Sequence, residues 1–394
     1  MIFSALVMAL LFGACSDSDV NPGSQIPEGD NKSIYLQFST NKQRTRAVEE
    51  TATGTAAPLL SAIIYFMDSA ADPLVYAVRT VGPTGADATV AQLEAGVEFN
   101  GIPTQVTQVY VVGNYNSADQ DGDAAAFPVY EGTTWSAIRS VILNIQQVAY
   151  PALSDGTTNG VLLSVMDGLA DVLDYDTNSA IWQGTNTPPA GSLFAEVPIE
   201  PLNARLEIEE ISYSGTLLAS FTIEGIYINN FFEELPVTLA IGTNEPLNNG
   251  SNVALYDRGD AAFAYDYYTT LEDEIGSALT VTGGTASLTA GGANEVWAYH
   301  VFGNSTPVPH IILKLTNVLA QDGTALGNRY VTVTGFTTTG GAAITTFERN
   351  VIYKITDLAF TDGDISIIPE PEEVSIWVHV EVEPWETVEV LPVI

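Results

Sequence analysis

Apolar and polar residues alternate near both ends of the chain, which is the pattern of a half-buried β-strand. Near the start, residues 33–39 read Ser-Ile-Tyr-Leu-Gln-Phe-Ser and place Ile34, Leu36 and Phe38 on one face. Near the end, residues 374–382 alternate in the same way. The apolar positions of this second segment are Val374, Ile376, Val378, Val380 and Val382. The sequence therefore predicts one strand at each end.

Between these ends, short apolar segments follow one another and are separated by Asn, Gly, Asp and Thr clusters. The continuous apolar runs Leu59–Met67 and Thr107–Gly113 indicate strands buried on both faces. Further strands are predicted over 202–211, 219–228, 236–241, 277–282, 295–301, 311–315, 330–335 and 351–358. Many short strands with turn residues between them indicate an all-β protein made of β-sandwiches.

Only two segments have the three- and four-residue apolar spacing of a helix. The first is short and spans Ala88–Val97. The second is Trp135–Val148, in which Trp135, Ile138, Val141 and Ile145 recur at helical intervals, with Thr133 or Thr134 as the N-cap. We therefore expect few, short helices.

The length of 394 residues suggests two domains, or three. Residues 182–189 are rich in Gly, Asn, Thr and Pro, and a second strand-rich half opens at Leu202. The predicted boundary is near residue 200, with an amino-terminal domain over 47–200 and a carboxy-terminal domain over 201–394.

The chain is strongly acidic. It has 12 basic and 48 acidic residues, a net charge of −36, and 46% hydrophobic residues. Such a surface repels nucleic acid and anionic membranes, so neither is an expected partner. The acidic residues are spread along the chain, which argues against a disordered acidic tail.

The first residues have the pattern of an export signal. Met1–Ala14 is almost purely apolar, too short to span a bilayer, and ends in small residues directly before Cys15, the single cysteine. This arrangement resembles a bacterial lipoprotein signal, in which the cysteine is acylated; a plain secretory signal is the alternative. Residues 16–32 then have the composition of a flexible tether.

Residues with catalytic or metal-binding chemistry are sparse. His300, His310 and His379 lack neighbouring ligands at metal spacing. Residues 119–123 alternate carboxylates as a calcium loop does, but Ala124 and Tyr130 stand where such a loop needs Gly and Glu. No nucleophile elbow, phosphate loop or dinucleotide motif is present. The sequence predicts no enzyme activity, no cofactor and no metal site.

A cluster of basic residues directly follows the first predicted strand. Lys42, Arg44 and Arg46 lie there, and Arg46–Ala47 suits a trypsin-like or Arg-specific protease. Cleavage would free the strand and leave a groove with unpaired backbone edges, which a C-terminal strand of another copy can fill. The alternative is that both terminal strands simply belong to their own sheets.

Taken together, these features resemble a fimbrillin of the Bacteroidales type V pili. The matching segments are the signal ending at Cys15, the strand 34–39, the Thr45-Arg46-Ala47 site, Thr107–Asn114, Leu202–Ile208 and the ending Val-Glu-Val-Glu-Pro384-Trp385. The resemblance implies two transthyretin-like Greek-key β-sandwich domains and export to the outer membrane as a lipoprotein.

The resemblance also implies cleavage after Arg46 and donation of a C-terminal strand from within Val374–Ile394. The groove-filling residues would be Val388, Val390 and Pro392 or Ile394, and the kink at Pro384-Trp385, whose Trp385 belongs to the donor segment, would divide a resident part from a donated part. Because both segments alternate, either can be the donor.

The expected function is a fimbrial stalk subunit that forms a homopolymer for adhesion and biofilm. Its partners would be fimbrial anchor and tip subunits, the Arg-specific protease and a host or bacterial surface ligand. Two alternatives remain: a tip or accessory subunit, and a surface glycan-binding lipoprotein, for which the aromatic cluster at 263–268 is the one dense candidate.

Overall fold

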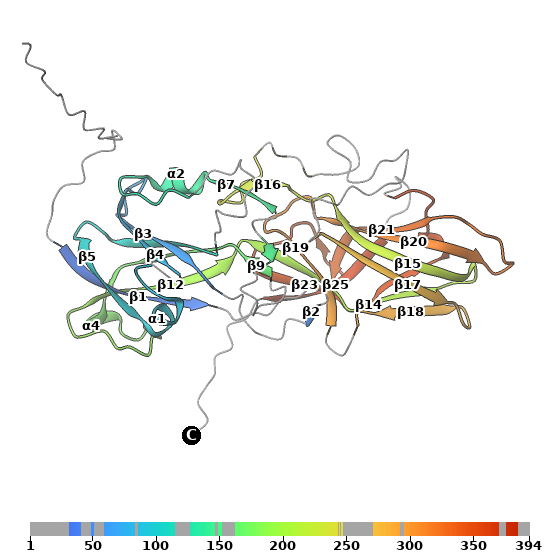
Figure 1. Cartoon of the computed structure of the whole chain (residues 1–394), viewed down its shortest axis with the longest axis horizontal. Helices are drawn as coiled ribbons and strands as arrows, with labels where there is room; N and C mark the ends of the chain where they lie inside the picture. Colours follow the sequence, from blue (N-terminus) through green and yellow to red (C-terminus); the bar gives the residue numbers. More distant parts are fainter. Residues whose placement is uncertain are drawn as a thin grey trace, which may run out of the picture.

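The molecule is elongated (Figure 1). Its regular secondary structure is almost all β-strand, as predicted. The computed structural model describes residues 31–40, 49–50, 59–82, 86–114, 127–145, 149–151, 162–242, 244, 246, 271–291, 295–369 and 376–384. We call the part up to Pro201 the amino-terminal half and the part from Asn203 the carboxy-terminal half. The two halves lie end to end along the long axis of the molecule.

The amino-terminal half is organised around an eight-stranded sheet. Its strands, in spatial order, are β4 (Val75–Val81), β3 (Ala62–Met67), β6 (Gln108–Gly113), β10 (Met166–Asp171), β12 (Leu193–Pro201), β1 (Asn31–Thr40) and β5 (Val97–Pro103), and β11 (Leu173–Asp174) also pairs with β12. A separate pair joins β8 (Ala149–Pro151) to β9 (Leu162–Ser164).

This sheet curls until its first and last strands approach each other. Arg79 Nη2 on β4 donates to the carbonyl of Asn100 on β5 at 3.5 Å, and the rings of Phe66 and Phe99 meet edge to face at 5.8 Å. The side chains inside the curl form a buried apolar core. A strand in this sheet therefore has paired neighbours and also contributes side chains to the enclosed core.

The apolar runs predicted to be buried on both faces are confirmed as β3 and β6. Ile64 and Phe66 face the enclosed core, whereas Tyr65 and Met67 face the opposite side, and all four are fully buried. The opposite side is covered by the segment that carries α2 (Trp135–Arg139) and β7 (Ile142–Asn144). Coverage on both faces explains why these strands lack alternation.

The first predicted helix is confirmed as α1 (Val90–Ala95). Its N-cap Thr89 accepts a hydrogen bond from the backbone N–H of Gln92, and the Gln92 side chain accepts one from the Thr89 backbone, which forms a capping box. A second short helix, α4 (Tyr175–Asn178), follows β11.

The second predicted helix is confirmed over Trp135–Arg139 and is wrong over Ser140–Asn144, and its last residues, 146–148, lie outside the described residues. Helix α2 has the expected N-cap, Thr134, but it ends at Arg139, and the chain continues as the extended strand β7. β7 pairs with β16 (Glu234–Pro236) of the other half, where Leu235 lies opposite Leu143. The β-branched residues Val141 and Ile142 suit a strand, so this distant pairing outweighs the local helical spacing.

The carboxy-terminal half contains the largest sheet. Its strands, in spatial order, are β17 (Glu272–Thr280), β15 (Leu218–Asn229), β20 (His310–Ala320), β21 (Arg329–Thr338), β25 (Ile376–Pro384), β23 (Val351–Ile355), β13 (Asn203–Ile208), β19 (Glu295–Phe302) and β2 (Glu49–Glu50), and β22 (Ala343–Ile344) pairs with β21. A smaller sheet joins β18 (Thr285–Thr289), β14 (Glu210–Ser214) and β24 (Leu358–Thr361), which the short η3 helix (Asp362–Asp364) follows.

Most strands predicted for this half are confirmed, but one is wrong. The segment predicted as a strand over 236–241 leaves the β16 ladder at Pro236 and turns. Leu239 has a positive φ of 55°, and its N–H donates to the carbonyl of Pro236 at 2.7 Å. A residue in the left-handed region cannot continue an extended strand.

The two halves are joined at more than one place. Besides the β7–β16 pair, Arg349 of the carboxy-terminal half forms an ion pair with Asp167 on β10, with an Nη2–Oδ1 distance of 2.6 Å. The same guanidinium donates to the carbonyls of Glu200 and Pro201, at 2.7 and 3.1 Å, where β12 ends. These contacts fix the end of β12 against the second half.

Candidate functional site

The leading strand, β1, lies inside the first sheet and not at its edge. It pairs in parallel with β12, from Ile34 opposite Leu193 to Thr40 opposite Ile199. On its other side it pairs antiparallel with β5, from Asn31 opposite Pro103 to Leu36 opposite Val97, with an irregularity between Lys32 and Ile34. We call the space between β12 and β5 the slot.

The inner face of β1 is part of the enclosed core. Ile34 and Leu36 are fully buried, and Phe38 is 2% exposed. Each buried side chain of this size contributes about 1.5–3 kcal/mol of transfer free energy. The three residues predicted to belong to a removable strand thus lie where removal would expose the core.

The outer face of β1 is polar and lies under helix α1. Gln37 is only 6% exposed, and its Nε2 donates a long hydrogen bond to the carbonyl of Glu94, at 3.4 Å. Across the ladder, Gln37 is paired with Glu196 on β12. Burial raises the pKa of the Glu196 carboxyl, which accepts a hydrogen bond from the backbone N–H of Gln183 at 2.9 Å.

Two contacts hold the start of β1 in register. The Lys32 amine donates to the carbonyl of Val106 at 2.5 Å, and the Ser33 hydroxyl donates to Oδ1 of Asn100 at 2.6 Å. Burial lowers the pKa of the Lys32 amine. The amine is therefore partly removed from water when the strand occupies the slot.

The predicted cleavage site, Arg46 and Ala47, lies outside the described residues, as does the predicted lipidation site, Cys15. The strands on either side of the Arg46–Ala47 bond are described. β1 ends at Thr40 in the first sheet, and β2 begins at Glu49 and pairs with β19 in the second sheet, where Glu50 lies opposite Glu295. The Arg46–Ala47 bond therefore falls between two strands that belong to different sheets.

The predicted C-terminal strand is resident in the second sheet. β25 pairs in parallel with β21, where Val378 lies opposite Phe336, and antiparallel with β23, where Val382 lies opposite Tyr353. Val378 and Val380 are buried in the core of the carboxy-terminal half. Ile376 opens the strand, opposite Val333. The remaining predicted donor residues, Val374, Trp385, Val388, Val390 and Ile394, lie outside the described residues.

His300 has a structural role in the carboxy-terminal half. His300 is buried, hydrogen-bonds through Nδ1 to the Asn203 amide, and has a pKa held well below its usual value by burial and by Arg205. Arg205 is itself fully buried, in an ion pair of 2.6 Å with Glu207. Within the described ranges, no group of three or more His, Cys, Asp or Glu side chains is arranged to hold a metal. The acidic segment 119–123 lies outside them.

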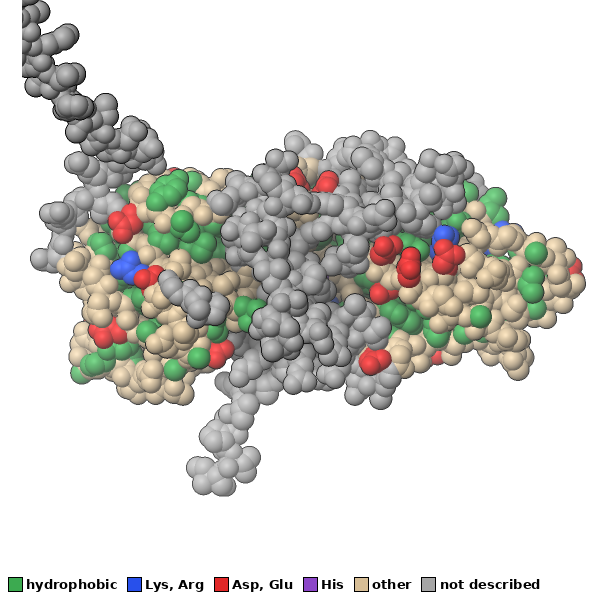
Figure 2. Space-filling view, viewed as in Figure 1, with side chains coloured by type: hydrophobic (Ala, Val, Ile, Leu, Met, Phe, Trp, Pro, Cys, Tyr) green, Lys and Arg blue, Asp and Glu red, His purple; other side chains and the backbone are tan. Residues whose placement is uncertain are grey.

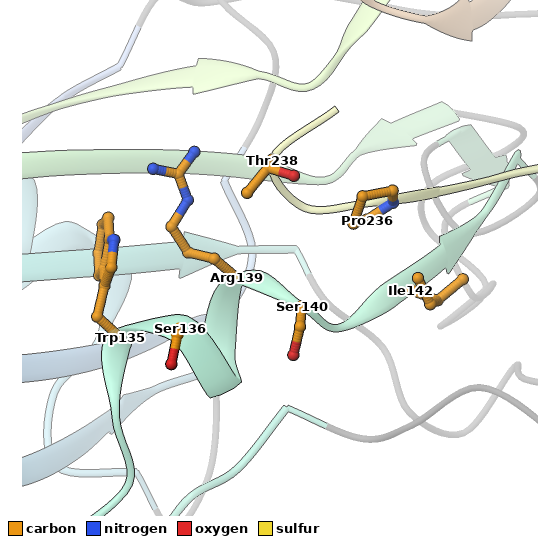
Figure 3. A pocket seen from close by; sticks show the side chains of 7 residues that line it. All are labelled: Trp135, Ser136, Arg139, Ser140, Ile142, Pro236 and Thr238. Carbon is orange, nitrogen blue, oxygen red and sulfur yellow. The ribbon is translucent and has the colours of Figure 1, made fainter. Parts of the chain in front are cut away.

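A shallow pocket of about 540 Å³ lies at the junction of the halves, between α2–β7 and β16. The Arg139 guanidinium lies 5.0 Å from the centroid of the Trp135 ring. Figure 3 shows these two side chains on the side of Thr238, whereas the hydroxyls of Ser136 and Ser140 point the other way. The lining supplies one cation, three hydroxyl groups and apolar surface, and holds no histidine, cysteine or carboxylate that could activate a hydroxyl.

The described part of the chain holds no helix long and apolar enough to cross a membrane. Figure 2 shows that acidic side chains are scattered over both halves on one face of the molecule, with few basic ones.

Sequence reasoning missed the strand that forms one wall of the slot. β12 pairs with β1, β10 and β11, and its residues Phe194, Val197 and Ile199 are buried. The alternation at 193–199 is a signal that could have identified the strand, but nothing local indicates its parallel pairing with a segment about 160 residues earlier.

Comparison with known proteins finds similar structures but no similar sequences. No protein-family model matches the chain, and no curated protein matches it. A solved "putative cell adhesion protein" from Bacteroides eggerthii matches with a TM-score of 0.51 and 14% identity, over 92% of this chain and 97% of the other. This chain shares its fold.

Other solved structures superpose less closely. A "putative cell adhesion protein" from Parabacteroides distasonis matches with a TM-score of 0.48 and 14% identity, over 92% of this chain and all of the other. The tip fimbrial protein Mfa3 from Porphyromonas gingivalis matches with a TM-score of 0.39 and 11% identity, over 90% of this chain and all of the other.

Proposed function

We propose that the chain is a structural subunit of a bacterial surface fimbria, which polymerises by donor-strand exchange after proteolysis and supports adhesion and biofilm. The description of the Bacteroides eggerthii protein, whose fold this chain shares, favours an adhesion role over an enzymatic one. The subunit is exported as a lipoprotein, acylated at Cys15, and reaches the outer membrane. It comprises two domains that meet near residue 200.

One observation carries this proposal: the leading strand is an internal strand of the first sheet, paired on both sides. β1 pairs on both sides and supplies Ile34, Leu36 and Phe38 to the core. Cleavage after Arg46 would leave it held by noncovalent contacts alone. Its loss would leave two unpaired backbone edges, on β12 and β5, and an uncovered apolar core.

The donated segment, in this proposal, follows Pro384. The strand 376–384 already completes the second sheet of its own molecule, so its removal would open a second groove. The tail beyond it carries Val388, Val390 and Ile394 at alternate positions, as a groove-filling strand needs.

The positions of the remaining basic residues support selective cleavage. Beyond Arg46, the described ones lie mostly within regular elements, in which the backbone is not free to enter a protease: Arg79 in β4, Arg139 in α2, Arg205 in β13, Lys314 in β20, Arg329 in β21 and Lys354 in β23. Arg349 lies outside such elements, but its side chain is bound to Asp167. Arg258 lies outside the described residues.

The glycan-binding alternative draws less support from the described tryptophans. Trp297 is buried, Trp135 packs on Tyr110 with ring centroids 4.5 Å apart, and Trp182 packs on Phe194 at 5.6 Å. These contacts fit packing roles. The aromatic cluster at 263–268 lies outside the described residues. A tip or accessory role would share the same slot.

The experiment that tests this function treats purified precursor with an Arg-specific protease and follows the appearance of a ladder that resists SDS without heating. Wild type should form the ladder. Arg46→Ala should abolish it because the strand stays tethered, and truncation after Pro384 should abolish it because no donor remains, although the monomer stays folded. A ladder formed by the truncated chain would contradict the donor assignment.

A further inference from the structure

The leading strand fits its slot well on one face and poorly on the other. Its inner residues Ile34, Leu36 and Phe38 are packed in the enclosed core. On the outer face, Gln37 is nearly as buried, yet its Oε1 is buried without a hydrogen-bond partner among the described residues. A buried polar atom that has lost water and gained no partner destabilises the state that contains it.

The two groups that the structure places next to the Gln37 side chain are both acceptors. Its amide nitrogen already points to the Glu94 carbonyl of α1, an acceptor, at a long 3.4 Å. The residue paired with it on β12 is Glu196, whose carboxylate is also an acceptor and receives the N–H of Gln183. Turning the amide around would place its oxygen against the Glu94 carbonyl, which is also an acceptor. In either orientation, neither Glu94 nor Glu196 gives the amide oxygen a donor.

At the start of the strand, Lys32 adds a second imperfect contact. Its charged amine is partly buried, with the Val106 carbonyl as its hydrogen-bond acceptor. Removal of an ammonium group from water opposes binding of the strand unless a counter-charge compensates. Both imperfect contacts lie on β1, which the proposed cleavage separates from the body.

We propose that Gln37 weakens the binding of the leading strand in its slot, so that a strand with an aliphatic residue at this position displaces it. This inference rests on the proposed function and concerns the direction and rate of the exchange. In the uncut chain, the covalent link to the rest of the chain keeps β1 in place. After cleavage, the buried Gln37 amide favours dissociation of the strand.

The sequence of the C-terminal tail fits this inference. If Val388 takes the place of Ile34, then Leu391 takes the place of Gln37. If the register shifts by two residues, so that Val390 replaces Ile34, then Val393 takes that place. In both registers an aliphatic side chain, with no polar atom to satisfy, replaces the amide.

The single cysteine makes release of the leading strand measurable. Cys15 lies on the segment that cleavage after Arg46 frees, so a thiol-reactive dye on the unacylated full-length chain labels that segment alone. The labelled protein is cleaved at nanomolar concentration, and a synthetic peptide of residues 385–394 is added in excess. Fluorescence anisotropy then reports the rate at which the labelled segment leaves.

The main variant is Gln37→Met, because Met has nearly the same length as Gln and lacks the polar atoms. We expect it to slow release about tenfold, equivalent to about 1.4 kcal/mol. The matched control is Gln25→Met, the same substitution on the same released segment but outside β1, which should leave the rate unchanged. Leu36→Ala should speed release, which shows that the signal reports occupancy of the slot.

The outcomes separate this inference from the function on which it rests. If wild type releases the segment and Gln37→Met releases it equally fast or faster, the role of Gln37 is wrong, and strand exchange stands. If the segment never leaves cleaved wild type despite excess peptide, both are wrong. Thermal unfolding of the uncut variants confirms that each has folded before it is cleaved.

Discussion

The two terminal strands of this chain occupy equivalent places in their sheets. β1 lies between the parallel strand β12 and the antiparallel strand β5, and β25 lies between the parallel strand β21 and the antiparallel strand β23. Both carry alternate apolar side chains into a buried core. In the folded molecule, neither is a spare edge strand.

They differ in how they are connected and in how well they fit. A basic segment that holds Arg46 follows β1, so the proposed cut would separate β1 from the rest of the chain, whereas β25 follows all the other described strands in the sequence. β1 also carries the buried amide of Gln37. In the proposed exchange, therefore, β1 differs from β25 through its connection and its imperfect contacts, and not through its position in the sheet.

The largest effect should come from removing β25. Truncation before Ile376 deletes a strand that pairs on both sides and takes Val378 and Val380 out of the core, so the carboxy-terminal half should lose its cooperative unfolding transition. Truncation after Pro384 keeps β25 and should leave the denaturant midpoint of that half unchanged. Urea unfolding followed by circular dichroism and tryptophan fluorescence measures both. A stable carboxy-terminal half without β25 would break the comparison.

A smaller effect should follow from a cavity on the inner face of β1. Leu36→Ala should lower the free energy of unfolding of the uncut precursor by about 2–5 kcal/mol, because the side chain is fully buried. The matched control is Leu169→Ala on β10 of the same sheet, where the leucine is 42% exposed and the change should stay within about 0.5 kcal/mol. Equal losses in the two variants would contradict the placement of β1 in the core.

The third prediction concerns pH and the carboxy-terminal half alone. Burial raises the pKa of the Asp273 carboxyl to about 6; the hydrogen bond from Tyr299, of 2.8 Å, opposes the shift, and the Glu272 charge adds to it. The folded state therefore binds the proton more tightly than the unfolded state. Stability contributed by this group is full below about pH 4, falls as the pH rises to about 6, and is flat above.

The size of this change is at most about 3 kcal/mol, given about 1.4 kcal/mol for each pKa unit. Asp273→Asn keeps an acceptor for Tyr299 but does not titrate, so it should remove this part of the pH dependence. Urea unfolding at pH 4, 5, 6 and 7 measures it. An unchanged slope in the variant would show that Asp273 is not the titrating group.

Much of the fold could be predicted because its signals are local. Runs such as Leu59–Met67 and alternating segments such as 33–39 specify strands through side-chain period alone. Helix α1 was predicted from its local pattern and confirmed with its capping box. The middle of the predicted helix Trp135–Val148 fails for the opposite reason: residues 142–144 form a strand because they pair with Glu234–Pro236, some 90 residues away.

The features of the candidate site also separate into those set by local sequence and those set by distant contacts. The sequence by itself determined which residues of the leading strand face inward, that a basic segment with Arg46 follows them, and that residues 386–394 alternate. Only the tertiary structure decided that β1 is internal, that β12 and β5 form its walls, that Gln37 lies buried beside Glu196, and that β25 stays in its own sheet. Side-chain period is written into neighbouring residues, whereas strand order and burial arise from contacts between segments far apart along the chain.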